Sequence, residues 1–149
     1  MKTSVNEISI RYNGKIQIAQ SPKISSSQDA FSIFQSTWDS NYIGVQEQFK
    51  VMLLNNSNRV KGILTLSSGG ITATVVDIRI LYAVVLKSLT TAIILAHNHP
   101  SGTLKPSSAD KQLTEKARKA GELLDIKLLD HLIISPNSQY FSFADEGLL

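Results

Sequence analysis

The sequence predicts a single α/β domain in which helices flank a mixed β-sheet. First, short apolar or alternating segments of strand length are spread along the chain. Second, stretches with apolar residues at helical spacing lie between them, and this interleaving favours a sheet covered by helices. Third, a chain of 149 residues with 42% hydrophobic and 18% charged residues can bury one core. We therefore treat residues 1–149 as one domain.

The N-terminal part, residues 1–45, is expected to contain a β-hairpin and a helix. Residues 7–12 and 15–20 alternate apolar and polar side chains, and Asn13-Gly14 between them is a strong signal for a two-residue hairpin turn. Serines followed by apolar residues at helical spacing predict a helix from about 27 to 39. The hairpin would expose an edge strand, which would allow a second copy of the chain to pair with it as a homodimer.

Two antiparallel strands, a helix and a third strand are expected next. An apolar strand begins near Glu47 and runs to residue 54, and after an asparagine-rich turn residues 59–66 return as its neighbour. The stretch 75–89 is rich in valine and isoleucine, which would suit a strand, but its length and its apolar recurrence favour a largely buried helix. Residues 92–96 form a short, fully apolar strand.

The C-terminal part is expected to contain a helix and two strands. Ser107 suits the N-cap position of a helix that continues to about Leu123 with one apolar face. Residues 127–134 form another strand, and after a turn residues 140–143 return as a short final strand. The predicted order is therefore β-β-α-β-β-α-β-α-β-β.

Composition limits the class of protein and the kind of metal site. The chain has no cysteine, so thiolate ligands and disulfides are excluded, and a metal must be held by His, Asp or Glu. The sequence shows neither a signal-peptide pattern nor an apolar stretch long enough to cross a bilayer, so we expect a cytoplasmic protein without membrane contact. The net charge of +3 and the isoelectric point of about 9.2 are only mildly basic.

The most specific feature is the segment 97–110, which begins directly after the apolar strand 92–96. His97 and His99 are two of the chain's three histidines, and residues i and i+2 of an extended segment point to the same side. Asp110 follows at the expected first turn of a helix, so that two imidazoles and a carboxylate can meet. Such ligands hold Zn²⁺ while leaving one position open for water.

A hydrolytic site also needs a group that takes the proton of the attacking water, and Glu47 at the start of a predicted strand is our candidate. Structural explanations compete with these roles. The histidines could simply form hydrogen bonds in a loop, Ser107 and Asp110 match a helix-capping pattern, and Glu47 could be a solvated charge. His131 in the strand 127–134 suits a fourth ligand or a proton carrier, although a hydrogen-bonded strand histidine is favoured.

These residues resemble the JAMM metal motif of the JAB/MPN family. The pattern is His97-x-His99-Pro100, six residues, and then Ser107-x-x-Asp110. Within that family the chain is most similar to the RadC group, and the similarity runs from about Gln46 to the C-terminus. It implies that residues 46–149 form a JAB/MPN core with the three-layer arrangement that cytidine deaminases also have. The segments that carry the similarity are 92–102, 106–110, 121–126 and 129–134.

The resemblance implies a Zn²⁺ ion held by His97, His99, Asp110 and a water. It assigns Glu47 the acid/base role, because the family's glutamate stands two residues before an apolar strand position. It also implies that Ser107 helps to stabilise the oxyanion. Enzymes with JAMM motifs hydrolyse peptide or isopeptide bonds, often at the C-terminal tail of a ubiquitin-like partner. The resemblance thus implies a zinc-dependent metallopeptidase that acts on a peptide or protein substrate.

A second interpretation is a protein associated with DNA repair or recombination, in which the metal is structural or vestigial. RadC chains typically carry a helix-hairpin-helix region before this domain, and we expect none in the residues before Glu47. Basic residues gather on or near the helix that follows Ser107, where they form either a solvated face or a surface that attracts phosphates or acidic segments. They are Lys105, Lys111, Lys116, Arg118 and Lys119.

Overall fold

Five strands form one mixed sheet at the centre of the computed structural model, which describes residues 4–7, 9, 12–69 and 75–149. The strand order is β2-β1-β3-β4-β5, and all neighbours are antiparallel except β3 and β4, which are parallel. The strands are β1 (Gln48–Leu54), β2 (Val60–Ser68), β3 (Ala92–Asn98), β4 (Lys127–Ile134) and β5 (Tyr140–Ser142). The helices are α1 (Ser27–Thr37), α2 (Ile78–Lys87), α3 (Ser108–Leu123) and a short 3-10 helix, η1 (Ile18–Gln20).

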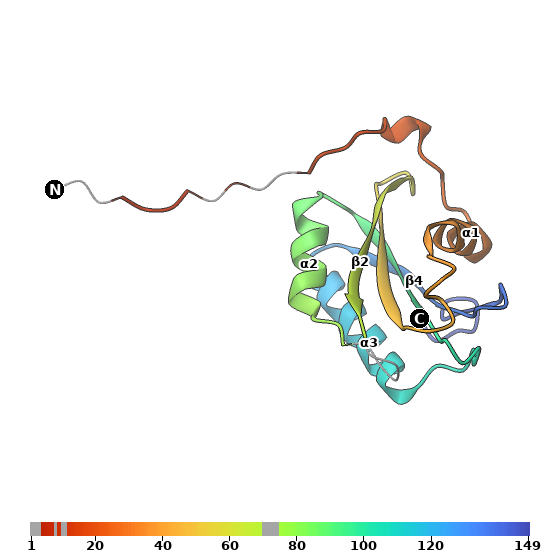
Figure 1. Cartoon of the computed structure of the whole chain (residues 1–149). Helices are drawn as coiled ribbons and strands as arrows, with labels where there is room; N and C mark the ends of the chain where they lie inside the picture. Colours follow the sequence, from red (N-terminus) through yellow and green to blue (C-terminus); the bar gives the residue numbers. More distant parts are fainter. Residues whose placement is uncertain (1–3, 8, 10–11, 70–74) are drawn as a thin grey trace.

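Helices cover both faces of the sheet, which confirms the predicted fold class (Figure 1). Alternate residues of β1 point to opposite sides: Phe49 and Val51 pack with α2 and α3, whereas Met52 packs with α1. Because both faces are covered, the two central strands β1 and β3 are buried along almost their whole length. The result is three layers, with α1 on one side of the sheet and α2 and α3 on the other.

The same alternation brings the polar ends of β1 and β3 to one side of the sheet. Phe49 pairs directly with His97 in the antiparallel ladder between β1 and β3. His97 follows Leu95 on the face that α2 and α3 cover. Glu47 stands two residues before Phe49, and His99 stands two residues after His97, so the alternation directs both side chains toward that face.

Strand β4 contains one extra residue relative to β3. The register shifts between Ile93 and Ile94 of β3, so that Leu129 of β4 has no partner there. Beyond this bulge, His131 pairs with Leu95, and its side chain points to the face covered by α2 and α3.

The predicted N-terminal hairpin is wrong. No β-ladder forms within the described part of residues 4–20, and residues 18–20, the end of the predicted second strand, form a 3-10 helix. Residues 8, 10 and 11 of the first strand lie outside the described residues. A two-stranded hairpin has little stability of its own in water, so the turn signal at Asn13-Gly14 does not suffice. The Tyr12 side chain instead contacts β2, where its hydroxyl donates to the Lys61 carbonyl at 2.8 Å. The argument for pairing two copies through this hairpin is therefore lost.

The other helices and strands agree with the prediction in kind and order. Helix α1 begins after Ser26, whose side chain caps it, and α2 begins only at Ile78, after the N-cap Asp77, so it is shorter than the predicted 75–89. Among the residues that the structure describes, no helix has both the length and the apolar character needed to cross a bilayer.

Candidate metal centre

Several potential ligand atoms converge where β3 ends and α3 begins. The Nε2 atoms of His97 and His99 are 3.0 Å apart. One carboxylate oxygen of Asp110 lies 3.3 Å from Nε2 of His97, and the other lies 3.5 Å from Nε2 of His99. Glu47 also offers a carboxylate oxygen, and the ligand atoms of Glu47, His97 and His99 all lie within 4.8 Å of one another. The structure thus brings together four of the side chains that the sequence analysis singled out.

The spacing of these atoms suits a tetrahedral cation. Ligands at roughly 2.0–2.1 Å from a tetrahedral Zn²⁺ ion are about 3.3 Å apart. The observed separations among His97, His99 and Asp110 are 3.0–3.5 Å. Neutral imidazole nitrogens and a carboxylate all present lone pairs to the shared space, so a cation between them would offset their mutual repulsion. Two nitrogens and one oxygen also form a donor set that zinc accepts, so the residues present fit this metal.

Glu47 is the last residue before β1. Its backbone carbonyl accepts a hydrogen bond of 2.8 Å from the N–H of Gly69, which ties it to the end of β2. Burial raises the pKa of its side chain, and the nearby His97 and His99 partly offset this shift. A partly buried carboxyl group with a raised pKa is suited to take up and release a proton.

Ser107 and Asp110 form a capping box at the start of α3. The Ser107 hydroxyl accepts a hydrogen bond of 3.0 Å from the Asp110 N–H, and the Asp110 carboxylate accepts one of 2.8 Å from the Ser107 N–H. Capping and metal binding are compatible, because the same carboxylate lies against His97 and His99. Burial acts to raise the pKa of Asp110, but the two histidines outweigh it and hold that pKa well below its usual range.

The site is closed on one side and open on the other. The His97 side chain is 1% exposed and its ring stacks on Phe49, whereas the side chains of His99 and Asp110 keep 17% and 15% of their surface. Nδ1 of His99 lies 2.7 Å from the carbonyl of Thr103. Because a carbonyl only accepts, the ring donates there, and in the neutral ring the Nε2 lone pair faces the site. The Asp110 carboxylate raises the pKa of His99.

His131 lies behind His97, away from the open side. Its Nε2 is 2.8 Å from Nδ1 of His97, and its Nδ1 is 2.6 Å from the hydroxyl oxygen of Thr114. It is completely buried, and burial holds its pKa well below the usual value, so the ring is neutral at neutral pH. Both ring nitrogens of His131 are therefore engaged with side chains of the protein.

Asn98, between the two metal-site histidines, is a residue that the sequence analysis missed. Its completely buried side chain donates hydrogen bonds to the carbonyls of Ile43 and Gln46, at 2.8 and 2.9 Å, and accepts one from the N–H of Gln48 at 2.7 Å. These bonds hold the chain on both sides of Glu47. The available signal was a polar residue at the end of an apolar strand, since a buried amide must find partners.

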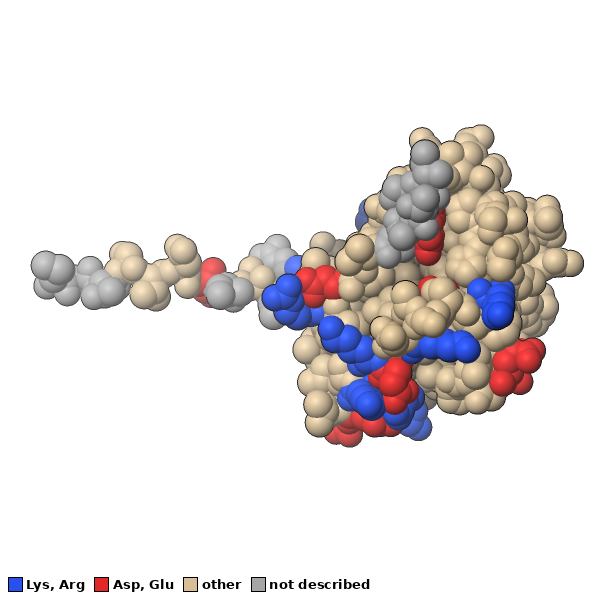
Figure 2. Space-filling model, turned by 90° about the horizontal axis from the view of Figure 1, so that it is seen from below, with Lys and Arg blue, Asp and Glu red and all other residues tan. Residues whose placement is uncertain are grey.

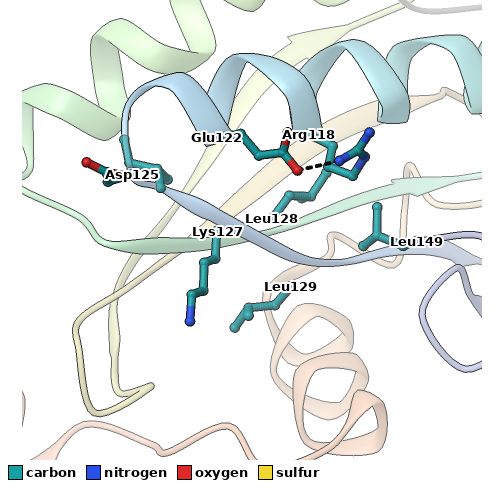
Figure 3. A pocket seen from close by; sticks show the side chains of 8 residues that line it. Arg118, Glu122, Asp125, Lys127, Leu128, Leu129 and Leu149 are labelled. Carbon is teal, nitrogen blue, oxygen red and sulfur yellow. Dashed lines mark hydrogen bonds and ion pairs between the residues drawn. The ribbon is translucent and has the colours of Figure 1, made fainter.

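A separate cavity of about 520 Å³ lies between the end of α3, the start of β4 and the C-terminus (Figure 3). Arg118 and Glu122 form an ion pair among its lining residues, and Leu128, Leu129 and Leu149 contribute apolar surface. None of the metal-site residues lines it. The candidate metal centre and this cavity are therefore separate features of the molecule.

The basic residues of α3 are interleaved with carboxylates. Arg118 pairs with Glu115 at 2.7 Å and also with Glu122, and Nζ of Lys119 lies 3.6 Å from Glu115. The view from below in Figure 2 likewise shows acidic side chains beside basic ones. This partial neutralisation weakens the attraction that α3 can exert on phosphates.

Comparison with known proteins identifies the family. The sequence profile described as the RadC-like JAB domain matches residues 24–148. The chain belongs to the RadC-like JAB domain family. This result confirms the resemblance found in the sequence. The matched range includes α1 of this JAB domain, in agreement with the packing of Phe31 and Phe34 against the sheet.

Curated relatives of this JAB domain come from several bacteria. A UPF0758 protein of Flavobacterium johnsoniae is 52% identical over 128 residues, which make up 85% of this chain and 53% of the relative. A UPF0758 protein of Porphyromonas gingivalis is 51% identical over 104 residues, or 70% of this chain and 46% of the relative. The UPF0758 protein YeeS of Escherichia coli is 44% identical over 110 residues, or 73% of this chain and 74% of the relative. The chain spans about half the length of the first two relatives.

Proposed function

We infer that this JAB domain is a zinc-dependent hydrolase, namely a metallopeptidase of the JAMM type that cleaves a peptide or isopeptide bond. The observation that carries the proposal is the convergence of three ligand groups, from His97, His99 and Asp110. A proton carrier, Glu47, stands within 4.8 Å of the histidine ligand atoms. Membership of the JAB family, together with an arrangement of acceptors that suits a tetrahedral cation, supports this assignment.

Bound at His97, His99 and Asp110, Zn²⁺ would polarise the scissile carbonyl and lower the pKa of a water to about 7. The protein's own groups would handle the protons. Glu47 would accept a proton from the attacking water and donate it to the leaving nitrogen, a role that suits its raised pKa. The Ser107 oxygen accepts the Asp110 N–H, so its hydroxyl hydrogen can donate toward the developing oxyanion.

The proposed substrate is a peptide or a protein segment, such as the tail of a ubiquitin-like protein. His99 and Asp110 keep part of their surface exposed while His97 is buried. A substrate would therefore approach over His99 and Asp110, and an extended chain can present its carbonyl to a site that opens on one side only.

Metal loading and hydrolysis test the two parts of the proposal separately. After zinc loading and removal of free metal, elemental analysis is expected to find one zinc per chain in the wild type and in Glu47→Gln, but none in His99→Ala. Hydrolysis of quenched peptide and isopeptide substrates is expected to be lost in both variants. Glu146→Gln changes an exposed carboxylate and should keep both properties. A wild type without stoichiometric zinc would refute the metal site, and a zinc-loaded wild type that cleaves neither substrate class would refute the peptidase assignment.

A second candidate function is association with nucleic acid in DNA transactions. It is favoured by Lys111, Lys116 and Lys119, which line a hollow on the outer surface of α3. If these residues contact phosphates, affinity for duplex DNA should fall steeply between about 50 and 200 mM salt. Lys111→Ala combined with Lys116→Ala should flatten that dependence, while His97→Ala should not. Weak binding that does not respond to salt would exclude this candidate.

A further inference from the structure

A continuous series of hydrogen bonds links two of the proposed metal ligands, His97 and Asp110, on the side away from solvent. Nδ1 of His97 is 2.8 Å from Nε2 of His131, and Nδ1 of His131 is 2.6 Å from the Thr114 hydroxyl oxygen. That hydroxyl is in turn 2.7 Å from the backbone carbonyl of Asp110. His131 is completely buried and Thr114 is 2% exposed, so water does not compete for these bonds. Strands β3 and β4 and helix α3 each contribute to the chain.

The direction of every bond in this chain follows from one group that can only accept. A backbone carbonyl carries no proton, so the Thr114 hydroxyl donates to Asp110. The Thr114 oxygen then accepts Nδ1–H of His131, and the lone pair on Nε2 of that neutral ring accepts Nδ1–H of His97. A neutral His97 with its proton on Nδ1 carries its lone pair on Nε2, the atom that faces His99 and Asp110.

We propose that His131 and Thr114 are positioning residues, which hold His97 in the tautomer and the orientation required for metal binding. The proposal rests on the proposed metal site but concerns residues outside the motif that predicted it. Metal-binding histidines commonly need such a partner at the second ring nitrogen. The ring of His131 is itself held by Phe143, which stacks on it with 4.8 Å between the ring centroids. Because the chain of bonds ends on Asp110, it also fixes α3 relative to β3.

Two pairs of variants separate the hydrogen bonds from the packing. Thr114→Val removes the hydroxyl but keeps the shape, whereas Thr114→Ser keeps the hydroxyl. His131→Met removes the acceptor for His97, whereas His131→Gln places an amide oxygen near the position of Nε2. Zinc affinity is measured by competition with a chelator, after urea unfolding has shown that each variant folds. We expect the affinity to fall about tenfold or more in Thr114→Val and His131→Met, and to return close to wild type in the serine and glutamine variants.

Nitrogen-15 NMR of the imidazole rings gives a second readout that needs neither activity nor metal. In the metal-free wild type at about pH 8, where unperturbed imidazoles are neutral, we expect His97 to carry its proton on Nδ1. In Thr114→Val the same ring should show a mixture of tautomers. Wild-type zinc affinity in both Thr114→Val and His131→Met, or a His97 protonated on Nε2 in the wild type, would overturn the proposal. If His131→Met fails to fold, the two threonine variants decide.

The failure of the proposed function has a different signature. A wild type that binds no zinc would refute the metal site, whereas the tautomer of His97 would still show whether His131 and Thr114 orient it. If the wild type binds zinc, and both Thr114→Val and His131→Met bind it equally tightly, only the positioning role is refuted.

Discussion

Replacing Asn98 with leucine is expected to lower the free energy of unfolding by about 3 kcal/mol. The leucine side chain has a similar size but cannot form the three hydrogen bonds that Asn98 makes to Ile43, Gln46 and Gln48. Each such bond contributes roughly 1 kcal/mol net, and more when the remaining partner stays buried. Asn98 itself is completely buried, so water does not replace it at these positions without local opening. Urea denaturation of the metal-free protein measures the change.

The same substitution should also disturb the candidate site, because two of the lost bonds anchor the neighbours of Glu47 on either side. Hydrolysis should therefore fall further than zinc affinity, since the ligands on β3 and α3 stay in place. Asn56→Leu, at an exposed position in the turn between β1 and β2, is the matched control and should change neither quantity. A loss of less than about 1 kcal/mol in Asn98→Leu would show that these bonds do not anchor the segment, and the reasoning would fail.

Three further predictions concern the metal, pH and packing. Saturating zinc should raise the melting temperature of the wild type and of Glu47→Gln but not of His99→Ala, as calorimetry can show; equal shifts in all three would place the metal elsewhere. The pKa of His131 is lowered in the folded state. Below about pH 6.5 the unfolded chain therefore takes up a proton at His131, whereas the folded chain does not. This uptake should reduce stability by up to about 1.4 kcal/mol per pH unit as the pH falls. The raised pKa of His99 makes stability change with pH in the opposite direction, and it does so in every variant. The test is therefore whether the stability of His131→Gln falls less steeply with decreasing pH than that of the wild type. Gly121→Ala should lower the free energy of unfolding by about 1–3 kcal/mol, because its Cβ would lie 2.5 Å from the backbone carbonyl oxygen of Ile126. Urea denaturation that finds a more stable variant would contradict this close packing at the end of α3.

The convergence of His97, His99 and Asp110, the candidate metal ligands, could be predicted because their signals are local. His97 and His99 share one side of an extended segment, and the capping pattern at Ser107 and Asp110 marks the start of a helix. Because the chain has no cysteine, these imidazoles and carboxylates are the side chains that limit which metals can bind. The position of Glu47 could not be predicted from local signals, because only the pairing of β1 with β3 brings it next to the histidines. The family resemblance supplied that information.

The rest depended on tertiary contacts that leave little trace in the sequence. Thr114 looks like an ordinary helix residue, and its role follows only from the packing of α3 on β4. Asn98 was visible as a polar residue but its partners, in the segment before β1, were not. The hairpin signal at Asn13-Gly14 failed for the converse reason, because a local turn preference without tertiary support is weak.

The unpaired Leu129 has a consequence for any comparison or redesign of this strand. Leu129 is the extra residue, so removing it would leave Leu128 paired with Ile93 and His131 paired with Leu95 in an uninterrupted ladder, with every later side chain on its present face. Closing the bulge with Leu129 retained would instead pair Asp130 with Leu95 and put Asp130 in the place of His131, with no substitution in the site itself. A grafted or aligned segment must therefore keep His131 paired with Leu95, whether or not it carries the extra residue before this pair.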